Sequence, residues 1–243
     1  MTASVIAILL LFAFGASFTQ RVTGFGFGIY IMTVLPFLMP SYAEATALSG
    51  LLALVTVVVS AFQLYKFLDW RKLWIILLVF IVISFFSVLA VSQIDSHLLK
   101  RVLGVVLILV SIYFFFFSGK IHLPPSAPVQ LAMGTVSGVM GGFFAMQGPP
   151  AVIYFLSCTE TKEEYLALAS MYFAIGNTMM TVFRFANGFV TPVVCRAWLV
   201  AVPSVIAGIW VGTKVSRRMP VEVLRKVVYA FMAVAGVLAI IFA

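Results

Sequence analysis

The feature that most constrains this chain is a series of apolar runs, each about 20 residues long. A run of that length, wound as an α-helix, crosses a hydrocarbon layer about 30 Å thick. Hydrophobic residues make up 64% of the sequence and charged residues 9%, whereas about 25% of the residues in a soluble domain are charged. Apolar residues fill both faces of every run, which favours helices over the strands of a membrane β-barrel. The sequence therefore predicts an all-α integral membrane protein.

The chain contains two related halves. A shift of 122 positions aligns Phe67-Leu68-Asp69-Trp70 with Phe189-Val190-Thr191-Pro192. We therefore predict an N-terminal repeat over residues 1–118, a linker over 119–127 and a C-terminal repeat over 128–243, which together form a single membrane domain. Each repeat is expected to hold three full-length spans, which lie at about 43–65, 73–92 and 100–118, and at 165–187, 195–213 and 223–242.

Each repeat opens with an apolar segment that is interrupted. Residues 3–39 are broken over 20–28, where three glycines alternate with apolar residues, and residues 128–158 are broken over 141–150, which ends in Gly-Pro-Pro. Either segment could form one kinked crossing, or a hairpin that enters and leaves on the same side. The distribution of Lys and Arg decides between these alternatives, because both residues favour cytoplasmic loops.

Hairpins give the more asymmetric distribution of basic residues. They place ten Lys and Arg inside and three outside, whereas single crossings place eight inside and five outside. We therefore predict hairpins, which orient the two repeats in opposite directions, as an inverted repeat, and leave both ends of the sequence outside. The predicted cytoplasmic set is Lys66, Arg71, Lys72, Lys120, Lys162, Lys214, Arg217, Arg218, Arg225 and Lys226, and the external set is Lys100, Arg101 and Arg196.

A helix that ends inside the membrane must find partners for its backbone N–H groups. Each arm of the second hairpin has only about 15 residues, so we expect its tip to stop inside the membrane. Two tips that enter from opposite faces would meet near the midplane, where secondary transporters build substrate sites. Pro149 and Pro150 suit the first turn of a restarting helix. Because helix N-termini carry partial positive charge, the two tips are expected to bind an anion.

Arg21, at the first break, is the cation expected to contact this anion, because an arginine in the membrane core is costly and usually faces a pathway. The alternative is that Arg21 extends to a lipid headgroup, and the same alternative is stronger for Arg184 near the outer end of its span. Asn177, in mid-span, either lines the site or joins helices. The predicted substrate-binding residues are Gln20, Arg21, Thr23, Gly24, Gly26, Gln147, Gly148, Pro149, Asn177 and Arg184.

Other classes of function lack the residues that they need. The net charge of +8 comes from short links between apolar runs, which indicates membrane topology and not nucleic-acid binding. No paired carboxylates, His and Asp set or metal cluster fall at one membrane depth, so we expect no catalysis, metal or cofactor. All seven acidic residues lie at segment ends or in links, so no buried carboxylate is expected. Residues 1–19 have no basic residue ahead of their apolar run, so we expect this segment to be retained and not cleaved.

The second break runs from Ser137-Gly138-Val139-Met140-Gly141-Gly142 to Gln147-Gly148-Pro149-Pro150. Together with the first break and the number of apolar segments, it resembles the TauE/SafE family of sulfite exporters and related permeases, over nearly the whole chain. The resemblance implies a multi-pass protein of the inner membrane that transports sulfite or a small organosulfonate such as sulfoacetate.

Export by alternating access is the mechanism that we expect. An anion that leaves a negatively polarised cytoplasm gains about 2.3 kcal/mol per charge per 100 mV, so export needs no coupling ion. An uptake permease, a channel and a membrane-embedded assembly subunit are the alternatives. The expected partners are the small anion and the lipid bilayer, and the sequence leaves homo-oligomer formation open.

Overall fold

The computed structural model describes residues 2–116, 123–215 and 237, and the regular elements within them are all helices. Six helices in this part of the chain are long and apolar enough to cross a membrane. The prediction of an all-α, multi-pass membrane protein is thereby confirmed. The predicted span at 223–242, the predicted basic residues Arg217, Arg218, Arg225 and Lys226, and residues 119–122 of the predicted linker lie outside the described residues.

Five predicted spans correspond to long helices, namely α4, α5, α6, α9 and α10. In chain order the elements are α1 (Ala3–Thr23), α2 (Phe27–Ile31), α3 (Leu35–Leu38), α4 (Tyr42–Leu64), the 3-10 helix η1 (Tyr65–Phe67), α5 (Trp70–Val91), α6 (Ser96–Phe116), α7 (Ala127–Phe144), α8 (Gly148–Cys158), α9 (Lys162–Ala186) and α10 (Pro192–Val215).

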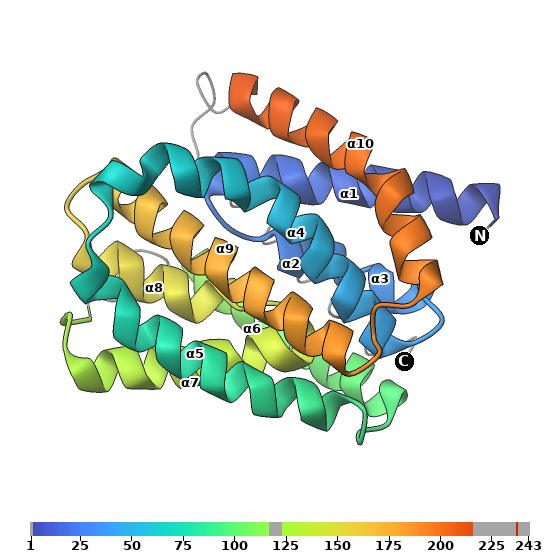
Figure 1. Ribbon diagram of the computed structural model, residues 1–243, viewed down its shortest axis with the longest axis horizontal. Coiled ribbons are helices and arrows are strands. Elements are labelled where there is room, and N and C mark those ends of the chain that lie inside the picture. Colours follow the sequence, from blue (N-terminus) through green and yellow to red (C-terminus); the bar gives the residue numbers. More distant parts are fainter. Residues whose placement is uncertain (1, 117–122, 216–236, 238–243) are drawn as a thin grey trace.

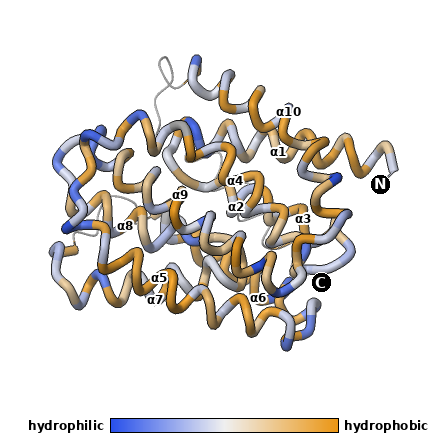
Figure 2. Tube along the Cα trace, in the orientation of Figure 1, coloured by the Kyte–Doolittle hydropathy of each residue, from blue (hydrophilic) through white to orange (hydrophobic). Residues whose placement is uncertain are grey.

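Short polar sequences fix where the two central helices, α4 and α9, begin. The Ser41 hydroxyl accepts a hydrogen bond from the Glu44 N–H group, and the Thr161 hydroxyl accepts one from the Glu164 N–H group. Both helices therefore start with the Ser/Thr-x-x-Glu pattern of a helix N-terminus. Hydrophobic residues then dominate the helices, while much of the hydrophilic sequence lies at their ends (Figure 2).

Both predicted breaks are present as interruptions of a helix. After α1, Gly24 and Gly26 adopt left-handed backbone angles, with φ of 83° and 99°, and the chain continues as the single-turn helix α2. After α7, Ala145 has φ of 55°, which is uncommon for a residue with a Cβ atom. Helix α8 then begins at Gly148, with prolines in its first turn as predicted. The first break therefore turns at two glycines, whereas the second turns at Ala145, whose positive φ is strained.

Glycines also let two pairs of helices approach closely. Helix α5 packs along α7, where a Cβ atom on Gly138 would lie 2.7 Å from Ile83 Cβ, and α10 packs along α1, where one on Gly212 would lie 3.0 Å from Arg21 Cβ. Membrane helices commonly associate through small residues in this way. The first arm of each hairpin is therefore packed against a helix of the other predicted repeat, with α1 beside α10 and α7 beside α5 (Figure 1).

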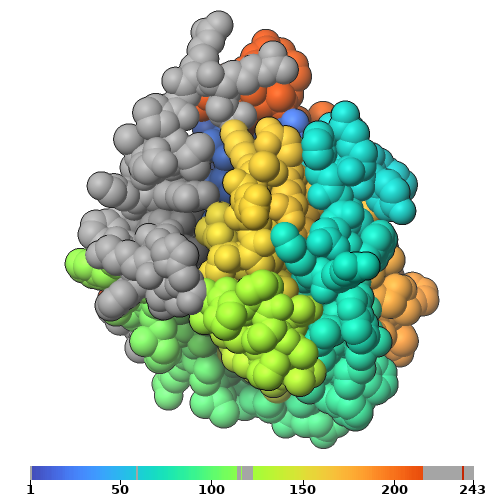
Figure 3. Space-filling model, turned by 90° about the vertical axis from the view of Figure 1, so that its left-hand side faces the viewer, coloured from blue at the N-terminus to red at the C-terminus, as the bar shows by residue number. Residues whose placement is uncertain are grey.

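Helices α4 and α9 pack against each other, between these two pairs, and run antiparallel (Figure 1). Near the start of α4, the Thr191 hydroxyl, which lies beyond the end of α9, donates a hydrogen bond of 2.6 Å to Glu44. We name this end of the bundle the Glu44 end. The opposite end, where α4 finishes and α9 begins, is the Lys162 end, and Figure 3 looks onto it. Helix α1 starts at the Glu44 end and α7 at the Lys162 end.

Candidate anion-binding site

The two breaks touch each other inside the helix bundle. A Cβ atom on Gly28 would lie only 2.0 Å from the carbonyl oxygen of Ala145. The backbone just after the first break therefore lies directly against the second break, and only glycine fits there without displacing one hairpin from the other. The contact between the breaks was predicted, and their depth in the bilayer stays a prediction.

A small cavity of about 30 Å³ lies where the breaks meet α4 and α9. This space is on the scale of one or two water molecules. It is lined by Ala53 and Val57 of α4 and by Phe173 and Asn177 of α9. The break residues that line it are Gln20, Gly26, Phe27, Gly28, Ile29, Ala145, Met146, Gln147 and Gly148.

Gln147 and Gln20 occupy corresponding breaks but have different partners. The Gln20 side chain spans its break, because its Oε1 accepts a hydrogen bond from the Phe27 N–H group and its Nε2 donates one to the Gly24 carbonyl. Gln147 is only 4% exposed, yet neither its Nε2 nor its Oε1 has a hydrogen-bond partner among residues 2–116, 123–215 and 237. An unpartnered buried amide costs about 1–3 kcal/mol. Gln147 is therefore the polar group of the small cavity that a ligand would satisfy.

Free backbone N–H groups are fewer than the sequence led us to expect. Pro149 and Pro150 have no N–H group, so Gly148 supplies the first N–H of α8 and the next two residues supply none. At the other break, the Phe27 N–H group is already bonded to Gln20, and α2 is only five residues long. Donors from side chains must therefore carry more of any anion binding than the two helix N-termini.

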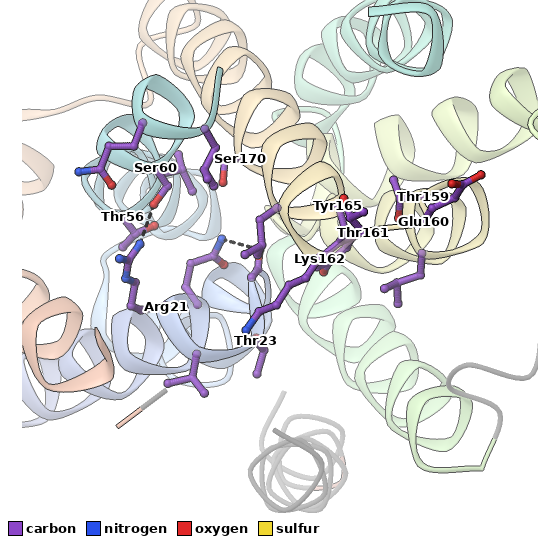
Figure 4. A pocket seen from close by; sticks show the side chains of 18 residues that line it. Arg21, Thr23, Thr56, Ser60, Thr159, Glu160, Thr161, Lys162, Tyr165 and Ser170 are labelled. Carbon is purple, nitrogen blue, oxygen red and sulfur yellow. Dashed lines mark hydrogen bonds between the residues drawn. The ribbon is translucent and has the colours of Figure 1, made fainter. Parts of the chain in front are cut away.

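A larger cavity of about 570 Å³ lies on the Lys162 side of the breaks (Figure 4). Gln20 and Val57 line both cavities, so the two adjoin. The volume falls in the range of small-molecule sites. Its walls come from the first break, from α4, and from α8 and α9 with the link between them; the lining residues are Gln20, Arg21, Val22, Thr23, Gly24, Thr56, Val57, Ser60, Gln63, Leu64, Leu156, Thr159, Glu160, Thr161, Lys162, Tyr165, Leu166 and Ser170.

Arg21 lines this larger cavity with its charge unpaired. Its Nε donates to the Thr213 hydroxyl at 2.8 Å and its Nη1 to the Ser60 hydroxyl at 2.9 Å. No carboxylate among the described residues forms an ion pair with it. Lys162 extends across the cavity toward Thr23, and among the described residues Glu160 is the one acidic side chain in the lining (Figure 4). The two cations outnumber the single carboxylate, which favours an anionic ligand.

The predicted site residues fall into three groups. Gln20, Gly26, Gln147, Gly148 and Asn177 line the small cavity, and Gln20, Arg21, Thr23 and Gly24 line the larger one. Pro149 is buried in the first turn of α8 and lines neither of these two cavities.

Arg184 also lines neither of the two cavities. It is fully buried, so the alternative that it extends to the lipid surface is wrong. Its Nη2 donates to the carbonyl oxygens of Gly141 at 2.9 Å and Gly142 at 3.5 Å, near the end of α7. The partial negative charge at the C-terminal end of α7 favours the guanidinium group in this buried position.

The expectation that no carboxylate is buried is wrong for Glu44. Glu44 lies in the first turn of α4, as its position near a segment end suggested, but it is only 8% exposed. Its two oxygens accept hydrogen bonds from Thr191 and Ser41, which compensate the burial. In the described ranges, no group of three His, Cys, Asp or Glu side chains is placed to hold a metal ion.

Sequence reasoning missed the walls of the larger cavity. Thr56, Ser60 and Gln63 recur every three or four residues on α4, which places them on one face of an otherwise apolar helix. This spacing was the feature of the sequence that could have identified the α4 wall of the cavity. Residues 159–162 gave no such signal, because only the folding of the α8–α9 link over the first break brings them to the cavity.

Comparison with known proteins agrees with this architecture. A family model described as "Sulfite exporter TauE/SafE" matches residues 9–239, which include both breaks and both cavities. The chain is 28% identical over 218 residues to a "Probable sulfite/organosulfonate exporter TauE" of Cupriavidus necator, a match that covers 84% of this chain and 80% of that protein. No solved structure matches the chain significantly. This chain therefore belongs to the sulfite exporter TauE/SafE family of membrane transporters.

Proposed function

We propose that this chain is a secondary transporter of the inner membrane that carries sulfite or a small organosulfonate, such as sulfoacetate, out of the cell by alternating access. The class of substrate is suggested by the family and by the name of the relative from Cupriavidus necator. The observation that carries the proposal is the unpartnered Gln147 carboxamide at the junction of the two breaks. Buried amide groups are usually hydrogen-bonded, so this one points to a missing partner.

The polar groups on the Lys162 side have separate roles in this proposal. Arg21 and Lys162 attract the anion into the larger cavity. The anion then moves past Gln20 to the junction of the breaks, where the Gln147 side chain and the Gly148 N–H group donate hydrogen bonds to its oxygens. The small cavity must widen to admit it, because about 30 Å³ is too little for an oxyanion of several atoms.

An inverted repeat would supply the second conformation of alternating access, in which the protein is open at the Glu44 end. Several features recur in the two halves: a broken hairpin, a central helix that begins with Ser/Thr-x-x-Glu, and a helix packed through glycines on the opposite hairpin. Exchange of the two conformations between the halves would close the larger cavity and open the Glu44 end. With the Lys162 end in the cytoplasm, as the basic residues predict, the described conformation is the one that loads substrate from the cytoplasm.

Proton-coupled uptake is the second candidate function. It is favoured by the buried Glu44 carboxylate, which joins the start of α4 to Thr191, because ionisable residues inside membrane proteins commonly mark ion pathways. Replacing Glu44 with Gln separates the two functions. Export driven by the membrane potential needs no titrating group at this position, whereas proton-coupled uptake would lose its dependence on the pH gradient.

Flux of labelled sulfite from proteoliposomes tests the proposed function. An imposed potential that is negative inside should accelerate efflux, because each charge that leaves gains about 2.3 kcal/mol per 100 mV. Gln147→Ala should lower the flux at least about tenfold, as expected for loss of a buried hydrogen bond to an anion. Gln93→Ala is the matched control, because Gln93 lies exposed in the turn after α5. Flux that ignores the potential would refute uncoupled export, and full flux through Gln147→Ala would refute the site.

A further inference from the structure

A buried cluster of polar side chains lies beyond the small cavity, toward the Glu44 end. Arg184 Nε and Nη1, Thr181 Oγ1 and Ser49 Oγ have no hydrogen-bond partner in the described part of the chain. A Cβ atom on Gly50 would lie 2.9 Å from Arg184 Nη1 and 3.6 Å from Thr181 Oγ1, so these two groups face the same point on α4. The Tyr42 hydroxyl is also unpartnered, and Tyr42 interacts electrostatically with Arg184. We call Tyr42, Thr181 and Arg184 the Arg184 cluster.

Nothing in the described residues neutralises the charge of this cluster. Glu44 is buried at the same end, but its two oxygens accept from Thr191 and Ser41, and it forms no ion pair with Arg184. A buried cation without a counter-charge destabilises the folded protein, because its desolvation is not compensated. Arg184 Nη2 donates to the carbonyl oxygens at the end of α7, whereas Nε and Nη1 are donors that have no acceptor among the described residues.

The Arg184 cluster continues the line of the two cavities along a single face of α9. Leu166 and Ser170 line the larger cavity, and Phe173 and Asn177 line the small one. Thr181 and Arg184 follow at the same steps of three and four residues, which keep all six side chains on one face of the helix. Seven residues separate Asn177 from Arg184, about 10 Å along the helix.

The facing side of α4 shows the same order. Ser60 lines the larger cavity, Val57 lines both cavities, Ala53 lines the small one, and Gly50 faces the Arg184 cluster. Two antiparallel helices thus present one continuous stripe, from the Lys162 end through the junction of the breaks to the cluster. Arg21 and Arg184 lie on opposite sides of that junction.

We propose that the Arg184 cluster is a second anion contact on the exit side of the pathway. It takes the sulfite or organosulfonate anion when the transporter opens at the Glu44 end, as Arg21 does when it opens at the Lys162 end. The free Nε and Nη1 donors of Arg184 and the Thr181 hydroxyl bind the oxygens of the anion. This inference rests on the proposed function, because it assigns a second contact to the same substrate.

Exchange of labelled sulfite, measured from each face of the membrane, tests the Arg184 cluster. Inside-out and right-side-out vesicles give the KM of each face separately. Arg184→Lys should raise the KM about tenfold at one face and leave the other within twofold, because lysine cannot place two N–H groups side by side. Arg21→Ala should raise the KM by a similar factor at the opposite face alone, because it removes the charge that draws the anion into the larger cavity. The two variants must act on opposite faces, whichever face is cytoplasmic.

Thr181→Val serves as the second variant, because it removes a hydroxyl of the cluster without touching the bonds to Gly141 and Gly142. It should raise the KM of the same face as Arg184→Lys, by about threefold for one neutral hydrogen bond. The proposal is overturned if Thr181→Val leaves both faces unchanged, if Arg184→Lys alters only thermal stability, or if the two arginine variants affect one face together. Absence of wild-type exchange would instead refute the proposed function.

Discussion

Arg21 and Gln147 would act on an anion in different ways. Arg21 keeps a full charge in the larger cavity, and within the described part of the chain its side chain donates hydrogen bonds to the hydroxyl groups of Ser60 and Thr213 alone. Gln147 is neutral and buried, and its side-chain carboxamide has no hydrogen-bond partner among the described residues. Charge acts over a distance and steers an anion toward the breaks, whereas a carboxamide acts only in contact and discriminates by geometry. The two residues therefore predict different defects when they are replaced.

Arg21→Ala should weaken sulfite binding by at least about tenfold and make the remaining binding less sensitive to salt, because the charge that steers the anion is lost. Arg21→Lys should weaken binding less, since it keeps the charge. Binding of labelled sulfite to the purified protein at low and high ionic strength checks this. Arg71→Ala is the control, because Arg71 is an exposed cation at the start of α5. Equal affinity of Arg21→Ala and the wild type would remove Arg21 from the pathway.

Among the elements, the two hairpins depend on one backbone contact that tolerates no side chain. Gly28→Ala should lower the thermal transition by several degrees and abolish most transport, because the new Cβ atom would lie 2.0 Å from the Ala145 carbonyl. Gly148→Ala is the matched control at the other break, where a Cβ atom would make an ordinary 3.6 Å contact with Phe173. Thermal unfolding in detergent compares the two variants, and flux is measured for Gly28→Ala alone, because Gly148 also belongs to the proposed anion site. Similar behaviour of the two variants would contradict the contact between the breaks.

The sequence was a good guide to elements whose cause is local. Apolar runs located α4, α5, α6, α9 and α10, and glycine and proline located both breaks. It could not show that Arg184 turns inward to the carbonyls of α7, or that residues 159–162 reach the first break. Those features depend on which helices become neighbours. An apolar helix of the membrane carries little information about that choice, because lipid and protein are equally apolar surroundings.

In the whole molecule, we expect the Lys162 end and the Glu44 end of the bundle to lie on opposite sides of the membrane, with the Lys162 end in the cytoplasm. In a background with Cys158→Ser and Cys195→Ser, Ala127→Cys at the start of α7 should react with an impermeant thiol reagent only when the reagent reaches the cytoplasm. Ser92→Cys at the end of α5 should react in intact cells. Both positions are exposed, so access is set by the bilayer and not by packing. Single crossings predict the opposite pattern, in which Ala127→Cys reacts in intact cells and Ser92→Cys reacts only from the cytoplasm, and that result would contradict the hairpins.

The central claim is that two helix breaks, one from each half of the chain, form a single anion site at the Gln147 carboxamide. A crystal structure with selenite, an oxyanion of sulfite's shape, tests it most directly, because selenium is located by its anomalous scattering. We expect a peak at the junction of the breaks, within hydrogen-bond distance of the Gln147 side chain and the Gly148 N–H group. A saturating selenite soak that leaves this junction empty, with the anion bound elsewhere, would contradict the account.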